Sequence, residues 1–162
     1  MNHSIGDTPK PRFPWKLILM TAALAGSLDI LAAFINSYAA GGRSPMIVLR
    51  FIASGVWGHQ AFSGDATMVL WGLLFHFIIA LIWTVIYFIG YFRVIRFIRN
   101  WFAAGLFYGV VVWIFMSRVV LPMSNVPLIP FDPLRALLAI AILMVCIGLP
   151  ISFMAHRYYR DK

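Results

Sequence analysis

Four long apolar stretches dominate the chain, and short polar or proline-containing segments separate them. They cover about residues 15–38, 67–92, 101–121 and 134–155. Each reaches or exceeds the roughly 20 residues that an α-helix needs to cross the hydrocarbon core of a bilayer. Lipid offers no hydrogen-bond partner to backbone N–H and C=O groups, so such a stretch satisfies them internally as a helix. The pattern predicts an all-α membrane protein with four transmembrane helices in one domain of residues 15–157, between polar segments 1–14 and 158–162.

Lys and Arg are unevenly divided between the two ends of these stretches. Nine lie at the end that carries both termini and the 93–99 segment. Four lie at the opposite end, namely Arg43, Arg50, Arg118 and Arg135. The positive-inside rule therefore predicts that both termini are cytoplasmic and that the 39–66 and 121–133 connections are on the outer side.

The two outer connections are expected to differ. The first holds MIVLRFIASGVWG, an apolar segment of 13 residues that is too short to span a bilayer. Ser44 suits a helix N-cap and Pro45 suits a first turn, so we expect an interfacial or re-entrant helix over about 45–57 that carries Arg50. The second, LPMSNVPLIPFDP, has four prolines and is expected to be semi-extended over the outer face.

Composition agrees with a membrane location and changes the meaning of the charge. Of the residues, 62% are hydrophobic and 11% charged, and the net charge is +8. In a soluble protein such a charge would suggest nucleic acid as a partner. Here the basic residues flank the apolar stretches, so we expect anionic lipid headgroups as their partners and no nucleic acid.

Two ionisable residues stand out because they lie deep in predicted spans. Asp29 is nine residues from the outer end of the first span, and His76 is nine residues from the outer end of the second. At ~1.5 Å per residue, both lie about 13 Å below the outer boundary. An ionised Asp at that depth costs several kcal/mol unless it is paired or neutralised, so we expect both side chains to face the bundle interior.

Small and polar residues share a face with each of them. On the first span these are Ala22, Gly26, Ala33 and Asn36, and on the second Gly72, Ala80 and Thr84. Such stripes let helices approach closely and hydrogen-bond across the contact. We predict that the stripes face each other with Asp29 and His76 hydrogen-bonded or ion-paired. The pair is either a proton-handling or ligand-binding site, or a polar clasp that fixes helix register.

Three further positions have candidate roles at an interface. Arg118, near the outer end of the third span, is expected to anchor that span at the membrane surface or to pair with Asp132. Gly105 and Gly109 form a GxxxG motif, which suits packing inside the bundle or against a partner helix. Pro150 is expected to kink the fourth span.

No catalytic centre, metal site or cofactor is predicted. Haem at His76 would need a second axial ligand at similar depth, and His3, His59 and His156 all lie outside the deep parts of the spans. The single cysteine, Cys146, is inside an apolar run and belongs to no metal-ligand spacing. No nucleophile–base set is visible, so we expect the chain not to be an enzyme.

Several segments together resemble a family of small bacterial four-helix membrane proteins of unknown function. They are AGSLDILAAF, RFIASGVWG, LFHFIIALIWTVIY, GLFYGVVVWIFMSRVVLP and CIGLPISFMAHR. The resemblance covers about residues 15–157. It implies a location in the bacterial inner membrane and the four-span fold, and it implies no activity.

Two functions fit these expectations. The first is a structural or accessory subunit that docks on a larger membrane complex through the third span and the outer helix. The second is a small proton-linked transporter or channel-like homo-oligomer that uses Asp29 and His76. Native mass in mild detergent separates the two, because the first predicts a larger heterologous complex and the second a homo-oligomer.

Overall fold

The computed structural model of the chain describes residues 14–41, 44–63, 65–127 and 130–160. Within these ranges the protein is built of helices and has no strand. Four continuous helices are long and apolar enough to cross a membrane: Trp15–Ala39, Ala66–Phe97, Trp101–Met123 and Pro133–Arg160. The first two are α1 and α4. The third comprises α5 (Trp101–Phe115), η1 (Met116–Val120) and α6 (Leu121–Met123), and the fourth comprises α7 (Pro133–Leu143), η2 (Met144–Gly148) and α8 (Leu149–Arg160).

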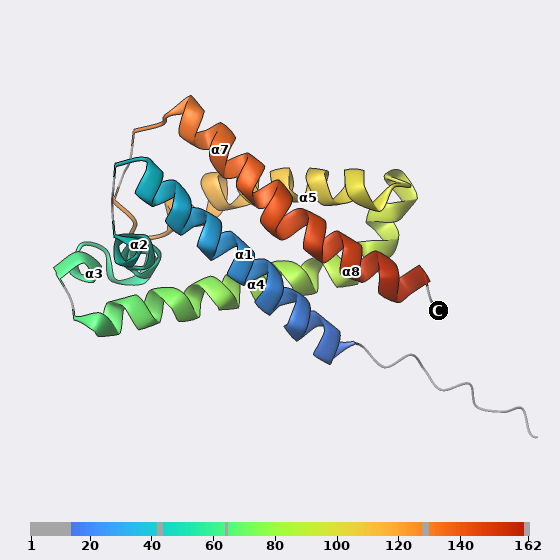
Figure 1. The fold of residues 1–162 in the computed structure, drawn as a ribbon, viewed down its shortest axis with the longest axis horizontal. Coiled ribbons are helices and arrows are strands. Elements are labelled where there is room, and N and C mark those ends of the chain that lie inside the picture. Colours follow the sequence, from blue (N-terminus) through green and yellow to red (C-terminus); the bar gives the residue numbers. More distant parts are fainter. Residues whose placement is uncertain (1–13, 42–43, 64, 128–129, 161–162) are drawn as a thin grey trace, which may run out of the picture.

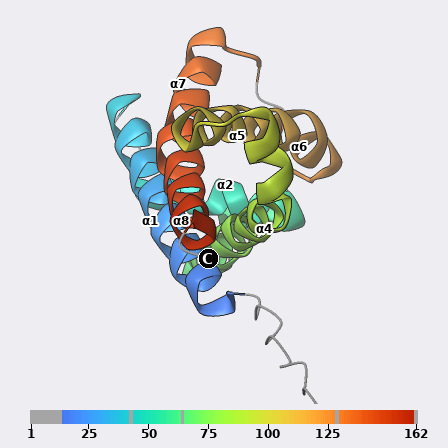
Figure 2. The same ribbon diagram turned by 90° about the vertical axis from the view of Figure 1, so that its right-hand side faces the viewer.

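The four long helices pack in two crossed directions. In Figure 1, α1 and the α7–α8 helix run diagonally and antiparallel, and α4 and α5 run nearly horizontally behind them. The start of α1, the turn from α4 to α5 and the end of α8 lie at one end, which we call the terminal end. The short helices α2 (Pro45–Trp57) and α3 (Gln60–Ser63) lie at the other end, the connecting end. Figure 2 shows the helices seen from the terminal end.

The second and fourth spanning helices continue about one turn beyond the apolar stretches that predicted them. The α4 helix ends at Phe97 rather than near residue 92, and α8 ends at Arg160 rather than near residue 155. In both cases the extra turn carries arginines, which the helix backbone tolerates although a hydropathy window does not. Asn100 then caps α5, with its Oδ1 accepting from the N–H of Phe102 at 2.9 Å.

The third helix also runs further than expected, because Leu121, Pro122 and Met123 remain helical as α6. The second connection is therefore shorter than the predicted semi-extended segment. Beyond α6, Asn125 bonds to the end of α2: its N–H donates to the Gly55 carbonyl at 3.0 Å and its Nδ2 to the Val56 carbonyl at 2.9 Å.

Each of the last two spanning helices contains one π-helical turn, η1 and η2, and each turn ends two residues before a proline. A proline inside a helix lacks its N–H, and its ring crowds the carbonyl four residues earlier. For Pro122 and Pro150 those carbonyls belong to Arg118 and Cys146, the central residues of the two π-turns. The irregularity predicted at Pro150 is thus a π-turn on its N-terminal side, and Pro122 has the same arrangement.

Glycines set the closest helix contacts. A Cβ on Gly109 would lie 2.6 Å from the Met144 backbone nitrogen, and one on Gly105 would lie 2.9 Å from the Gly148 carbonyl oxygen. Of the two roles considered for the GxxxG motif, the structure therefore has packing inside the bundle, against η2. On the other side, a Cβ on Gly72 would overlap the Leu49 carbonyl, so α2 lies directly on α4.

The α2 helix begins as the sequence indicates. Ser44 is its N-cap, with its Oγ accepting from the N–H of Met46 at 3.3 Å, and Pro45 is in the first turn. Its far end is held by Trp57, whose ring centroid lies 5.3 Å from that of Trp71 and 5.4 Å from that of Phe75 in α4. Because of these contacts, α2 is part of the bundle rather than a detached outer segment.

Tyrosines dominate the core of the terminal half. Tyr87 and Ser152 are hydrogen-bonded at 2.6 Å, and Ser152 Oγ also donates to the Trp101 carbonyl at 2.7 Å. Since the single Ser152 hydroxyl hydrogen goes to that carbonyl, Tyr87 is the donor to Ser152. One turn away, Tyr91 Oη lies 2.8 Å from His156 Nδ1. These bonds join α4, α5 and α8.

The outer surface of the bundle is apolar. Large side chains that face outward include Met20, Ile35, Leu70, Ile89 and Leu137, each more than half exposed. A contiguous surface of this kind is unfavourable in water and favourable in hydrocarbon. The fold therefore fits a polytopic membrane protein.

Candidate functional site

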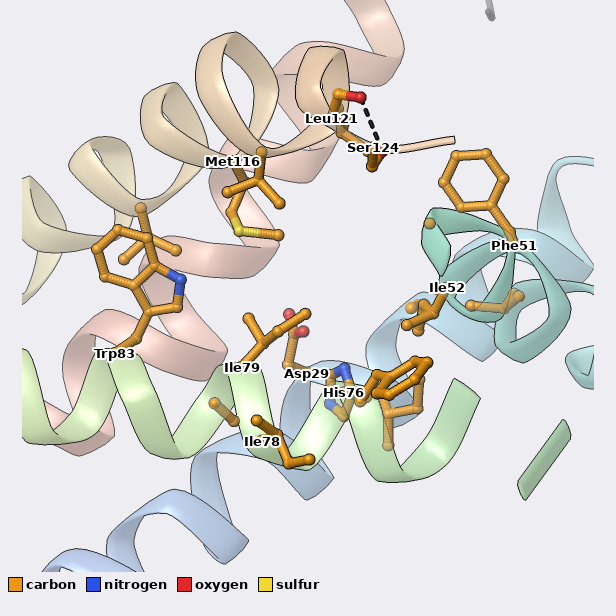
Figure 3. Close-up of a pocket in the computed structure, with 18 of the residues that line it drawn as sticks. Asp29, Phe51, Ile52, His76, Ile78, Ile79, Trp83, Met116, Leu121 and Ser124 are labelled. Atoms are coloured by element: carbon orange, nitrogen blue, oxygen red, sulfur yellow. Dashed lines mark hydrogen bonds between the residues drawn. The ribbon is translucent and has the colours of Figure 1, made fainter. Parts of the chain in front are cut away.

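A cavity of about 520 Å³ lies between the two helix directions, next to Asp29 and His76. Its volume is within the roughly 300–1,000 Å³ of small-molecule sites. Figure 3 shows Phe51 and Ile52 of α2 on one side and Trp83 of α4 on the other. The remaining lining is contributed by further residues of α2 and α4, by α1, α5, η1, α6, α7 and η2, and by the first residues of the second connection, and most of it is aliphatic.

The lining has few polar side chains, and two of them already make hydrogen bonds to backbone carbonyls. The polar side chains are Asp29, His76, Ser124 and the indole of Trp83. Ser124 Oγ donates to the Leu121 carbonyl at 2.7 Å, which is the dashed line in Figure 3. The cavity is therefore an apolar space with one carboxylate and one imidazole on its wall.

His76 is held by the backbone of the neighbouring helix. Its Nε2 lies 2.8 Å from the carbonyl oxygen of Gly26 in α1. A carbonyl oxygen can only accept, so Nε2 carries the proton of this bond. In the neutral ring Nδ1 is then an unprotonated acceptor.

Gly26 makes this contact possible. A Cβ at that position would lie 3.0 Å from the Phe77 ring and 3.2 Å from the Ala80 Cβ. Without a side chain there, α4 approaches α1 closely enough for His76 to reach the backbone. Because Gly26 has no Cβ, His76 of α4 can hydrogen-bond to the backbone of α1.

Asp29 lies one turn after Gly26 on α1, and its carboxylate is close enough to His76 for their charges to interact. The direct hydrogen bond or ion pair predicted between these two side chains does not occur in the described structure. His76 bonds to the Gly26 backbone instead, and the Asp29 carboxylate points toward the cavity beside Ile79 (Figure 3). The two groups are neighbours on one wall rather than partners in one bond.

The stripes of small residues meet over only part of their length. Gly26 and Ala80 pack together where α1 crosses α4. Thr84 is buried and donates to the Ala80 carbonyl of its own helix at 2.8 Å. Gly72 faces α2, and Asn36 lines a different cavity. The helices cross rather than run alongside each other, so residues distant from the crossing separate.

That second cavity has a volume of about 860 Å³ and lies between α1, α2, α7 and the second connection. Its wall carries Asn36, Ser37, Asp132 and Arg135, and it is more polar than the first. Asp29 lines both cavities. The apolar cavity and the more polar one, which extends toward the connecting end, therefore adjoin at Asp29.

The remaining predicted residues have local partners. Asp132 caps α7, accepting from the N–H of Leu134 at 2.9 Å, and its other oxygen pairs with Arg135 at 3.2 Å. The alternative pairing of Asp132 with Arg118 is therefore wrong, because a cap and an i,i+3 partner are closer; Arg118 is exposed in η1. Arg50 Nη1 donates to the Phe62 carbonyl at 2.7 Å and so joins α2 to α3.

The tyrosine network was not predicted, although the sequence carries a signal for it. Tyr87 and Tyr91 are four residues apart in one span, and Ser152 and His156 are four apart in another. Residues at that spacing share a helix face, so two matched pairs indicate one polar contact between the helices. The π-turn residues that line the first cavity, Met116, Val120 and Ile147, had no comparable signal.

Comparison with known proteins adds no assignment, since no family model, curated protein or solved structure matches the chain. The resemblance to small four-helix membrane proteins therefore stays an expectation from the quoted segments. Functional inference depends on the geometry of the two cavities.

Proposed function

We propose that the protein is a polytopic membrane protein that binds a small amphiphile in the apolar cavity and exchanges protons at Asp29 and His76 when it does so. The observation that carries the proposal is the position of Asp29 on the walls of both cavities. A ligand in the first cavity can contact the carboxylate, while the polar lining of the second connects it to the connecting end. A carboxylate in this position supports proton-linked transport as the function.

His76 supports the same proposal. Its Nε2 is fixed by the Gly26 carbonyl, so the ring keeps one orientation and Nδ1 is its remaining nitrogen. The polar-clasp alternative predicted a direct bond between the two side chains. Here the helix contact is made through the backbone, and the carboxylate is left facing a cavity.

The accessory-subunit hypothesis has less structural support. It invoked the GxxxG face of the third span as a docking surface, but Gly105 and Gly109 are covered by η2. It also invoked the outer helix, which is packed on α4. A larger complex would have to use other surfaces, and native mass in mild detergent distinguishes it from a monomer or homo-oligomer.

The proposed topology has both termini in the cytoplasm and places the protein in a bacterial inner membrane with anionic headgroups at the terminal end. Charge supports the orientation: Lys16, Arg93, Arg96, Arg99 and Arg157 all lie at the terminal end of the helices. The bacterial location is supported by the sequence resemblance alone. Cysteine accessibility at residues 10 and 59, in a Cys146→Ser background, tests the orientation in intact cells.

Binding is tested with four probes that share one hydrocarbon: adamantane carrying an amine, an alcohol, an acetyl group or a carboxylate. Equilibrium dialysis in mild detergent compares the wild type with Ile52→Trp, which fills the first cavity, and Leu137→Trp, which adds the same side chain on the exposed face. We expect at least one probe to bind saturably to the wild type and Leu137→Trp and not to Ile52→Trp. The proposal is wrong if no probe shows this pattern while all three proteins remain folded.

A further inference from the structure

We infer that the ligand of the apolar cavity is a hydrophobic cation, an amine or guanidine whose N–H groups bind at Asp29 and His76 and whose hydrocarbon part fills the space toward Trp83. This inference rests on the proposed function and names the substrate class of the same site. It follows from the donors and acceptors on the cavity wall, from the local charge, and from the lining.

The wall beside Asp29 offers acceptors and almost no donors. The ionised carboxylate only accepts. Neutral His76 has its N–H engaged with Gly26, so Nδ1 also accepts. Ser124 has used its hydroxyl hydrogen on the Leu121 carbonyl. A ligand that binds here must therefore supply N–H or O–H groups, because a carbonyl or ether would leave these acceptors unpaired.

The indole N–H of Trp83, a donor in the cavity lining, is distant from the acceptors of Asp29 and His76. The Trp83 indole N–H is on α4, seven residues from His76, which is two helical turns or roughly 10 Å. In Figure 3 Ile79 lies between the indole and the Asp29 carboxylate. A ligand that bound through a carbonyl would have to use Trp83 and would leave Asp29 desolvated and unpaired, which is unfavourable by several kcal/mol.

Charge leads to the same class of ligand. A carboxylate in an apolar cavity is stabilised by a positive charge in contact with it. Within the described structure Asp29 has no Lys or Arg in an ion pair, and Arg135 of the second cavity is already paired with Asp132. A cationic ligand would neutralise the negative charge of Asp29, whereas an anionic ligand would add a second negative charge.

The rest of the cavity accepts a hydrocarbon group. Its walls include Ile52, Ile78, Val112, Met116 and Ile147. Burial of such a group contributes roughly 25 cal/mol per Å² of apolar surface. The rings of Phe51, Phe75 and Trp83 add faces that attract a cation. A compact hydrophobic amine satisfies both parts of the site.

Binding of a cation and binding of protons are then competitive. Protonated Asp29 has no charge to offer, so loss of its proton favours binding of the cation, and binding should strengthen at higher pH. Affinity should rise with pH by about tenfold per unit for each proton displaced. The other titratable and charged groups around this wall are Cys146 of η2, which interacts electrostatically with Asp29, Arg50 of α2, and the Asp132 and Arg135 pair of the second cavity.

The experiment uses the same adamantane probes with full-length protein in mild detergent, between pH 5 and pH 8, where the amine stays protonated. We expect the amine to bind at least tenfold more tightly than the acetyl or carboxylate probe at pH 8, with its affinity falling as pH falls. Proton release in weakly buffered solution should accompany amine binding. Asp29→Asn should abolish both the preference for the amine and the proton release, and His76→Gln should leave the preference for the amine in place.

The outcomes separate this inference from the proposed function. If the acetyl or carboxylate probe binds best, and Ile52→Trp removes that binding, the cavity is a ligand site and the cation assignment is wrong. If no probe binds in a way that Ile52→Trp removes, the proposed function itself fails. If Asp29→Asn does not fold, Asp29→Glu provides the second variant, for which amine preference and proton release should both persist. Their loss in a folded Asp29→Glu protein would also contradict the cation assignment.

Discussion

Gly148 in η2 lies against Gly105 in α5 so closely that a Cβ on Gly148 would overlap the Gly105 carbonyl oxygen. The obstruction is backbone rather than a movable side chain, so α5 and η2 can keep this spacing only with glycine at position 148. The contact also places η2, and with it Ile147 and Leu143, on the wall of the apolar cavity.

Replacing this glycine should therefore be costly. Gly148→Ala is expected to lower the free energy of unfolding by about 3 kcal/mol, the upper end of the range for overpacked sites. Gly90→Ala in α4 is the matched control, since a Cβ there meets nothing within 4 Å. That variant should be neutral or up to about 1 kcal/mol more stable. Thermal unfolding in detergent measures both, and equal effects would contradict the packing described.

The hydrogen bond between Tyr87 and Ser152 should contribute less to the free energy of unfolding than the Gly148 contact does. Tyr87→Phe removes the donor to Ser152 and is expected to lower stability by about 1 kcal/mol. Tyr38→Phe is the control, because Tyr38 is 71% exposed. Thermal unfolding of both variants is the measurement. An unchanged midpoint for Tyr87→Phe would mean that the bond carries no net stabilisation.

Asn125 should control access to the first cavity. Its two bonds join the second connection to Gly55 and Val56 at the end of α2, and residues of both segments line the cavity. Asn125→Ala should therefore speed association and dissociation of the adamantane amine severalfold with little change in affinity. Ser63→Ala, which removes an exposed bond within α3, should leave the rates unchanged. Stopped-flow proton release follows both rates, and a change in affinity alone would assign Asn125 to the site itself.

Arg50 should hold α3 rather than take part in binding. Its Nη1 bonds to the Phe62 carbonyl, whereas its Nε is buried without a partner. Arg50→Met removes both the bond and the unsatisfied donor, so the net change in stability should be within about 1 kcal/mol. Limited proteolysis between residues 58 and 65 should become faster. Loss of amine binding in a folded Arg50→Met protein would contradict this role.

Much of the fold was predictable because hydropathy and capping are local. The four spans and the helix after Ser44 depend on residues that are close together in sequence. The helix ends at Phe97 and Arg160 were less predictable, because arginine at the last turn is compatible with both helix and loop. Hydropathy alone does not choose between them.

The candidate site was predictable only in part. Depth and helical face identified Asp29 and His76 as interior residues, and both reach one cavity. Their bonding could not be predicted, because it depends on the missing side chain at Gly26 and on the crossing of α1 and α4. The cavity itself depends on two π-turns and on the position of Asn125, which are properties of the assembled bundle.

The two π-turns also change the angular register of the helices that contain them. A π-turn holds one residue more than the α-turn it replaces, so it acts as a one-residue insertion and shifts the phase of later residues by about 100°. In the third span, the face presented before Met116 is therefore not the face presented after Val120. The same shift occurs in the fourth span across η2. A single helical wheel drawn through either span would therefore assign residues before and after the π-turn to the same face incorrectly. Each half of the span needs its own wheel.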